Sequence, residues 1–204
     1  MCKGASLHIT AGAVILLALF IFLASPLLAV SVLAAAVIHE LGHYLALRAL
    51  GAGVERVRIS ALGAEMSVVG SDGLSYGGEM LAFLAGPLVN LIAAFLLGFA
   101  GRRYEALYPA AGANLVLGIF NLLPVRPLDG GNLLWIITAW ISEPFTADRI
   151  AKVVGAVTAG LLLIFGIWLT FCRAGSPFLL LASAGLLMNT LRKCACKTEE
   201  NEVK

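Results

Sequence analysis

Long stretches of apolar residues, separated by short polar segments, dominate the pattern along this chain. An α-helix needs about 20 mostly apolar residues to cross a bilayer. Five stretches approach or exceed that length: Leu7–Ala24, Leu27–Leu50, Met80–Gly101, Ala151–Cys172 and Pro177–Leu191. A sixth, Ala106–Val125, is weaker and is interrupted by glycines. The pattern therefore predicts an all-α polytopic membrane protein with about six transmembrane helices.

The segment between the second and third stretches has a different period. Apolar and polar residues alternate from Arg56 to Ala61 and again from Ala64 to Val68, on either side of Leu62-Gly63. Alternation with a period of two around a glycine is typical of a β-hairpin, and a plain amphipathic loop is the alternative. We predict a small membrane-associated hairpin over residues 54–69 on the cytoplasmic face.

Composition agrees with a lipid environment. Hydrophobic residues make up 60% of the chain and charged residues 13%, whereas soluble proteins carry about a quarter charged residues. The net charge of +2, without a basic patch, gives no indication of a nucleic-acid partner. Cys194 and Cys196 are predicted to be reduced thiols rather than a metal or redox pair.

The distribution of Lys and Arg predicts the orientation in the membrane. If residues 126–150 do not span, 11 of the 14 basic residues fall on one side of a six-span layout. If Leu128–Ile141 also spans, the split becomes 6 against 8 and the bias disappears. Because basic residues concentrate in cytoplasmic loops, we predict six spans with both termini cytoplasmic.

The pentapeptide HELGH, residues 39–43, lies within the second apolar stretch. Residues four apart on a helix lie on nearly the same face, so His39 and His43 can bind one Zn²⁺. Glu40 lies about 100° round the helix from His39, where it can act as a general base but not join the histidines as a ligand. Ionisable residues within a span are functional candidates by default. The alternative is a structural histidine pair that hydrogen-bonds between helices, with Glu40 as its partner.

A catalytic zinc site needs a third protein ligand and an open position. Asp129 follows two prolines in FNLLPVRPLDGGNLLW and opens a new apolar stretch, so its carboxylate can point inward from irregular backbone. Asp is also a preferred helix N-cap, which is the structural alternative for Asp129. From spacing alone we rank Asp129 first and Glu79 second, and Glu65 is a further carboxylate.

With HELGH in a membrane helix and NLLPVRPLDGG downstream, the chain resembles the site-2 proteases, the intramembrane zinc metalloproteases of peptidase family M50. The resemblance covers roughly residues 30–132. It implies that His39, His43 and Asp129 bind one zinc ion and that Glu40 is catalytic. It also implies that Asn121 and Pro124 contact the substrate.

Two further features belong to the resemblance. The sequence Gly86-Pro87-Leu88-Val89-Asn90 is similar to a G-P-x-x-N element of the family's third core span, for which we expect a role in helix packing. The six-span layout is similar to the stage IV sporulation protein FB group, which releases a sporulation sigma factor from its membrane-bound precursor. This resemblance implies a bacterial cell membrane as the location. We predict one metalloprotease domain over residues 1–192, with its core at 27–142, a polar tail at 193–204, and no CBS or PDZ domain.

Together these features predict an intramembrane zinc metalloendopeptidase in regulated intramembrane proteolysis. Its expected partners are a membrane-anchored protein substrate, a membrane regulatory protein and the lipid bilayer. The alternative from another class is a non-enzymatic membrane zinc-binding protein or transporter. A transporter needs polar groups along a pathway through several spans, whereas the polar groups here cluster at one depth. A metalloprotease that uses HExxH with a downstream Glu is a second enzymatic alternative.

Overall fold

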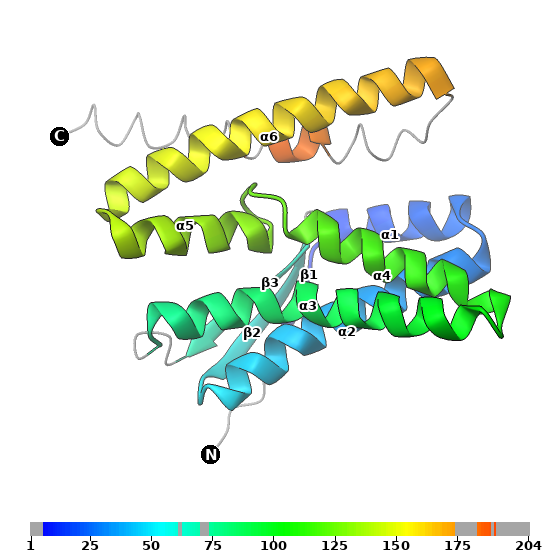
Figure 1. Cartoon of the computed structure of the whole chain (residues 1–204), viewed down its shortest axis with the longest axis horizontal. Coiled ribbons are helices and arrows are strands. Elements are labelled where there is room, and N and C mark those ends of the chain that lie inside the picture. The colour runs from blue at the N-terminus through cyan, green and yellow to red at the C-terminus, as the bar shows by residue number, and fades with distance from the viewer. Residues whose placement is uncertain (1–5, 61–62, 70–73, 174–182, 189, 191–204) are drawn as a thin grey trace. The chain divides into compact units, whose positions relative to one another are not determined.

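The computed structural model describes residues 6–60, 63–69, 74–173, 183–188 and 190 (Figure 1). The chain divides into two compact units, Met1–Asn121 and Leu122–Lys204, and each is described by itself. The sequence predicts one domain over residues 1–192, and that organisation stays a prediction.

The first unit combines helices with a small sheet. Its elements are β1 (Ser6–Ile9), α1 (Ala11–Leu23), α2 (Pro26–Ala49), β2 (Gly53–Ser60), β3 (Gly63–Val69), α3 (Tyr76–Gly101), the 3₁₀ turn η2 (Glu105–Leu107) and α4 (Tyr108–Asn121). Helices α2, α3 and α4 of this unit pack against one another (Figure 1).

Both long helices of the first unit begin at a serine cap. Ser25 precedes Pro26 of α2, and its Oγ accepts a hydrogen bond from the Leu28 N–H at 3.4 Å. Ser75 does the same for α3, accepting from the Gly78 N–H at 3.2 Å. A serine oxygen at this position satisfies an N–H that the helix itself leaves without an acceptor. Helix α2 ends where Gly51 adopts a φ of 80°, a conformation that glycine tolerates best.

The sheet has three strands in the order β1-β2-β3. β2 and β3 pair antiparallel, with Val57 opposite Met66, and are the antiparallel pair that the alternation predicts. The residues between them, 61–62, lie outside the described part of the chain. β1 pairs parallel to β2, with Leu7 opposite Val57. The all-α prediction therefore needs a correction, because a third strand joins the segment expected to be only a hairpin.

The same strand corrects the first expected span. The predicted helix Leu7–Ala24 begins instead at Ala11, and α1 has 13 residues. Such a helix is about 20 Å long, against a hydrocarbon core of about 30 Å. Periodicity missed the boundary because residues 7–9 continue the apolar run that follows. Similarly, the sixth stretch corresponds to α4, which has 14 residues.

The second unit contains α5 (Asp129–Ile141) and α6 (Pro144–Arg173), which pack against each other. The expected span Ala151–Cys172 lies within α6, which begins seven residues earlier than predicted. The expected span Pro177–Leu191 falls largely outside the described residues; within it, residues 183–188 are helical.

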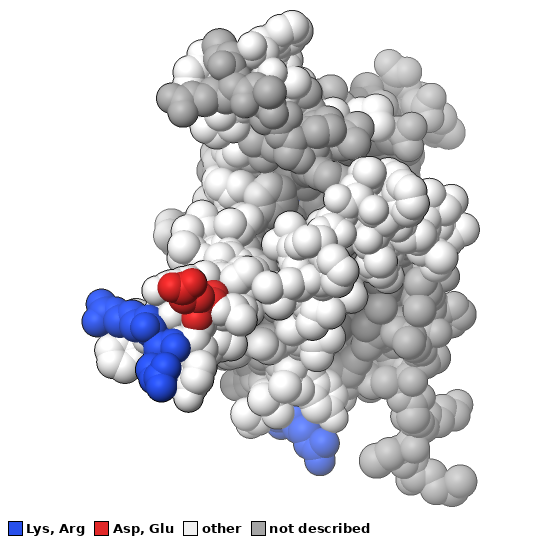
Figure 2. Space-filling view, turned by 90° about the vertical axis from the view of Figure 1, so that its right-hand side faces the viewer, with Lys and Arg blue, Asp and Glu red and all other residues white. Residues whose placement is uncertain are grey.

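Three of the described helices are long and apolar enough to cross a membrane: Pro26–Ala49, Tyr76–Gly101 and Pro144–Phe171. They expose large apolar side chains, among them Phe95 (73%), Phe99 (66%) and Phe171 (86%). Figure 2 shows one face of the molecule on which few of the described side chains are charged. Such a surface suits lipid rather than water. The layout of six spans is not confirmed by the described residues.

Candidate metal centre

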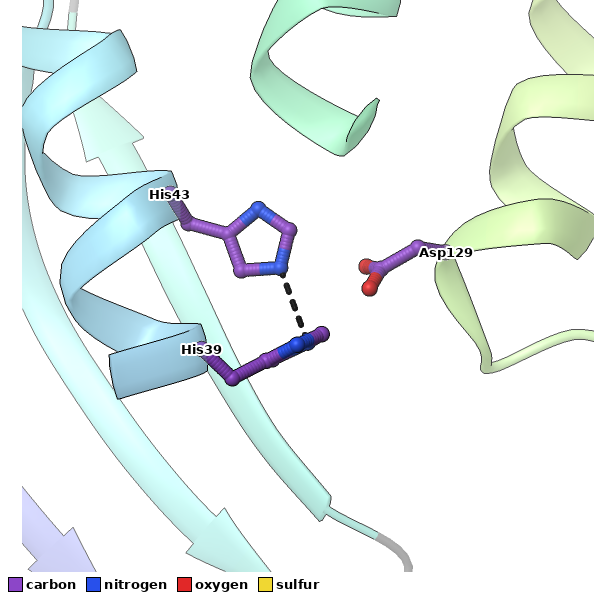
Figure 3. Close-up of side chains that lie close together, drawn as sticks. All are labelled: His39, His43 and Asp129. Carbon is purple, nitrogen blue, oxygen red and sulfur yellow. Dashed lines mark hydrogen bonds between the residues drawn. The ribbon is translucent and has the colours of Figure 1, made fainter. Parts of the chain in front are cut away.

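The two histidines of HELGH lie side by side in the second half of α2 (Figure 3). His39 is buried and His43 is half-buried. Their Nε2 atoms are 3.1 Å apart, and the rings meet edge to face, with centroids 4.7 Å apart and planes at 85°. The spacing of four residues therefore converges two imidazole nitrogens on one point, as the sequence predicts.

The other nitrogen of each ring is held by helix α3. His39 Nδ1 donates to the side-chain oxygen of Asn90 at 3.0 Å, and His43 Nδ1 donates to the carbonyl of Ala82 at 2.8 Å. Both partners are acceptors, so each Nδ1 carries the ring proton and each Nε2 carries a lone pair. In the neutral rings these two lone pairs face each other at 3.1 Å, an arrangement that a cation beside both, whether a metal ion or a proton, stabilises. The protein thus holds both rings in the tautomer that a metal ligand requires.

The separation of the two nitrogens fits a zinc ion. With Zn–N distances of about 2.0–2.1 Å and a tetrahedral angle, two ligating nitrogens lie about 3.3–3.4 Å apart. The 3.1 Å between His39 and His43 needs only a small adjustment to reach that value. The imidazole pair therefore passes the geometric test for two of the ligands of a zinc site.

Two glycines bring α2 and α3 close enough for these contacts. A Cβ at Gly86 of α3 would lie 2.7 Å from Cε1 and 2.8 Å from Cδ2 of the His43 ring, and would contact its Nε2 as well. A Cβ at Gly42 of α2 would lie 2.9 Å from the carbonyl oxygen of Ala85. Small residues allow membrane helices to approach closely. In addition, the missing side chain of Gly86 leaves the space that the His43 ring fills.

We predict that Gly86→Ala disrupts metal binding with little effect on the fold. The new methyl group would push the His43 imidazole away from His39. Zinc affinity, measured by chelator competition, is expected to fall by at least the roughly 10–100-fold that loss of an outer-shell partner costs. Gly98→Ala on the same helix is the matched control, because a Cβ there meets only Ala111 at an ordinary 3.9 Å. Equal zinc affinity in the two variants would contradict the packing argument.

Glu40 follows His39 on α2 and is half-buried. The helix turns it about 100° from His39, so it borders the imidazole pair without joining it as a third ligand on the same face. A carboxylate in that position can exchange protons with a water molecule beside the two imidazoles.

Asp129 is the first residue of α5 in the second unit, and it is half-buried (Figure 3). The N-cap position belongs to Leu128, which makes no side-chain cap bond. This corrects the alternative in which Asp129 is itself the N-cap. A carboxylate in the first turn of a helix is stabilised in its ionised form by the helix dipole, which suits a metal ligand.

The glycines after Asp129 allow the preceding loop to pass against the start of α5. A Cβ at Gly130 would lie 2.7 Å from the carbonyl oxygen of Leu123, and one at Gly131 would lie 2.7 Å from that of Val125. These neighbours are backbone atoms and cannot rotate away. The loop is also closed by hydrogen bonds from Val125 N–H to Leu123 O and from Leu128 N–H to Val125 O. The sequence LDGG therefore specifies a tight backbone crossing directly beside Asp129.

Arg126 ties this loop to both helices of the second unit. Its Nε donates to Asn132 of α5 at 3.1 Å, and its guanidinium lies over the Trp135 ring, 5.3 Å from the centroid. It also lies 3.7 Å from the Asp148 carboxylate of α6, which accepts a hydrogen bond from the Trp135 indole N–H at 2.7 Å. Burial lowers the pKa of Arg126, and the charge of Asp148 opposes that shift. The cluster restrains the segment that leads into Asp129.

The other predicted residues lie on α4, α3, β3 and the loop before α5. Asn121 ends α4, and its side-chain N–H donates to the Leu117 carbonyl of the same helix at 3.1 Å. Pro124 is half-buried in the loop before α5. Glu79, the second-ranked third ligand, is in the first turn of α3, and Glu65 lies in β3. The substrate-contacting roles of Asn121 and Pro124 stay predictions.

The role of Asn90 was not predicted from the sequence, in which its G-P-x-x-N element indicated helix packing. Asn90 is fully buried and contacts a histidine 51 positions away in the sequence. The available signal was an amide in the middle of an apolar helix, because a polar group at that depth requires a partner.

Comparison with known proteins agrees with a zinc centre at these histidines. The family model for peptidase family M50 matches residues 102–165. The chain is 32% identical over 138 residues to zinc metalloprotease MJ0392 of Methanocaldococcus jannaschii, covering 64% of this chain and 40% of the relative. It is 34% identical over 142 residues to the putative zinc metalloprotease Rip3 of Mycobacterium tuberculosis, covering 65% of this chain and 35% of the relative. The chain thus spans about two fifths or less of the length of these curated relatives.

The fold has a solved counterpart. The structure of a site-2 protease from Methanocaldococcus jannaschii matches with a TM-score of 0.67 and 25% identity, covering 94% of this chain and 93% of that one. The HELGH pair, the LDGG crossing, the family match and this structural likeness point the same way: the chain is similar to proteins of peptidase family M50 and to a solved site-2 protease.

Proposed function

We propose that this protein is an intramembrane zinc metalloendopeptidase that hydrolyses a peptide bond in a membrane-embedded or membrane-tethered substrate. One observation carries the proposal. The Nε2 atoms of His39 and His43 face each other at 3.1 Å, with each Nδ1 committed to an acceptor on α3, within a 24-residue apolar helix. A purely structural histidine pair has no need of two lone pairs directed at one point.

In this proposal His39, His43 and Asp129 hold one zinc ion. The chemistry of the donors supports it, because imidazole nitrogen and carboxylate oxygen are both common ligands of catalytic zinc. Three protein ligands leave a position for substrate or water, which is typical of a catalytic zinc site. When bound, zinc supplies Lewis-acid chemistry that polarises a carbonyl and makes water more acidic.

Glu40 is the proposed proton carrier. Its carboxylate takes a proton from the attacking water and passes it to the leaving amine, so that neither a hydroxide nor an amide anion has to form free in lipid. Asn90 and the Ala82 carbonyl hold the imidazoles in place through these steps, because their bonds to Nδ1 do not involve the reacting atoms.

The substrate is proposed to bind in an extended form, because a fully hydrogen-bonded helix does not expose its carbonyls to attack. β3 has β2 on one side and is the last strand in the sheet order. Such an edge strand can pair with an extended peptide through backbone hydrogen bonds. Asn121 and Pro124, close in sequence to the loop that leads to Asp129, are proposed to contact the peptide.

The proposed membrane layout has six spans and both termini in the cytoplasm, of which α2, α3 and α6 have the length and composition of spans. A sporulation sigma-factor precursor is one proposed substrate, on the resemblance to the stage IV sporulation protein FB group. A membrane-anchored substrate and a membrane regulatory protein are the proposed partners.

The test is a cleavage assay with purified protein in lipid nanodiscs and a membrane-tethered reporter substrate. A zinc chelator is expected to stop cleavage, and added Zn²⁺ is expected to restore it. Cleavage that persists after the bound metal has been removed would refute a metalloprotease. Zinc binding without cleavage of any tethered substrate would favour the zinc-binding or transport alternative.

A further inference from the structure

We infer that Asn90 is a positioning residue for the metal-ligating His39, and that Asn114 extends this support to a third helix. The inference rests on the proposed zinc site only for the ion; the hydrogen-bond network itself lies within the first unit. Through this network α4, which carries no predicted metal ligand, helps to position a ligand of the metal centre.

The network is buried and continuous. Asn90 and Asn114 are exposed by 0% and 1%. Asn90 Nδ2 donates to the Ala35 carbonyl at 3.1 Å and to Asn114 Oδ1 at 3.0 Å, while Asn90 Oδ1 accepts from His39. Asn114 Nδ2 in turn donates to the Ala110 carbonyl, one turn earlier on α4, at 2.8 Å.

The hydrogen-bond partners determine the orientation of both side-chain amides. Because the Ala110 carbonyl can only accept, the NH₂ of Asn114 faces it and Oδ1 of Asn114 faces Asn90. Asn90 must then present its NH₂ to Asn114 and to Ala35, which leaves its oxygen for His39. Turning either amide over would set two donors or two acceptors against each other in a buried site, where an unsatisfied polar group costs about 1–3 kcal/mol.

The consequence reaches the metal-binding atom. An oxygen at Asn90 compels His39 to carry its proton on Nδ1, and this leaves Nε2 as the lone-pair atom directed at His43. An imidazole without such a partner divides between two tautomers and rotates more freely. Outer-shell partners of this kind typically change metal affinity by about 10–100-fold. The two asparagines therefore specify which nitrogen of His39 is available to the ion.

The test uses the full chain in nanodiscs and two measurements that do not depend on proteolysis. Zinc affinity is measured by chelator competition, and the tautomer of His39 is read from ¹⁵N NMR of histidine-labelled protein, which contains only three histidines. Three variants are compared: Asn90→Leu, Asn90→Asp and Asn114→Leu. Ser31→Ala is the matched control, because it removes a hydrogen bond of the buried Ser31 on α2, to the Leu27 carbonyl, away from both histidines.

Asn90→Leu removes the acceptor, so zinc affinity is expected to fall about 10–100-fold and the Nδ1–H signal to divide between two tautomers. Asn90→Asp keeps an acceptor for His39 while losing both donors. It is expected to lower the melting temperature as Asn90→Leu does, yet to keep the tautomer and zinc affinity within about tenfold of the unaltered protein. Asn114→Leu is expected to have a smaller effect in the same direction, and Ser31→Ala none on zinc.

Two results would overturn the inference. One is an Asn90→Leu protein with unchanged zinc affinity and an undivided Nδ1–H signal. The other is an Asn90→Asp protein that loses zinc as severely as Asn90→Leu, because the acceptor would then not matter. If Asn90→Leu does not fold, Asn90→Asp and Asn114→Leu decide the matter. If the unaltered protein binds no zinc, the proposed function fails, while the tautomer measurement on zinc-free protein still tests the network.

Discussion

Replacing Glu40 by Gln is expected to abolish cleavage of a membrane-tethered substrate while leaving the zinc content unchanged. The amide has nearly the shape of the carboxylate but cannot take a proton from water or return one to the leaving amine. Positioned acid–base groups contribute roughly 10²–10⁴-fold to a rate, so the expected loss is at least of that order. The measurement is the single-turnover cleavage rate in nanodiscs, with zinc determined on the same preparation.

The matched control is Glu105→Gln, the same chemical change at an exposed residue of η2. It is expected to cleave at the rate of the unaltered protein. A Glu40→Gln enzyme that retains that rate would show that another group carries the proton. A Glu40→Gln protein that loses its zinc would instead place Glu40 among the ligands.

Replacing Asp129 by Asn is expected to lower zinc affinity by more than about 100-fold, beyond the usual cost of losing an outer-shell partner. The change removes the negative charge and keeps the shape, so the start of α5 and the crossing of its glycines should persist. Chelator competition measures the affinity, and circular dichroism checks that helix content is unchanged.

Glu79→Gln serves as the comparison for the third ligand, because Glu79 is the carboxylate ranked second from spacing. It lies in the first turn of α3, where an acidic residue is already stabilised by the helix dipole. We expect it to bind zinc as the unaltered protein does. If Glu79→Gln loses zinc and Asp129→Asn retains it, the third ligand is Glu79 and the assignment of Asp129 is wrong.

The sequence was sufficient for the part of the centre that depends on local geometry. Two histidines four residues apart on a helix must share a face, so the convergence of His39 and His43 followed from their spacing. The contacts that hold the rings did not follow, because Ala82 and Asn90 are 39 and 51 positions away from their histidines. Contacts at such distances depend on how α2 and α3 pack, which periodicity does not reveal.

The role of the glycines could likewise be predicted only in part from the sequence. The LDGG sequence marked Asp129 as unusual, but the reason for its glycines is a backbone crossing with the residues before it. Gly86 belonged to an element expected to pack helices, whereas its absent side chain is the space that the His43 ring fills. A sequence pattern can mark a position as unusual without revealing which atoms come close to it.

Span boundaries were the least predictable feature. Apolar composition does not separate a strand from the helix that follows it, so β1 was included in the first expected span. In the same way, an apolar run in sequence overestimated the length of α4, which has 14 residues. Hydropathy measures the environment of a residue, and the start of a helix depends on caps and backbone pairing as well.

The most direct test of the whole account is the metal content of the purified chain, combined with zinc K-edge X-ray absorption. We expect about one zinc ion per chain, with two imidazole nitrogens among its ligands at about 2.0–2.1 Å. We also expect zinc to be lost when His39 and His43 are both replaced by Ala. A protein that binds no zinc, or that keeps a full complement after both histidines are replaced, would contradict it.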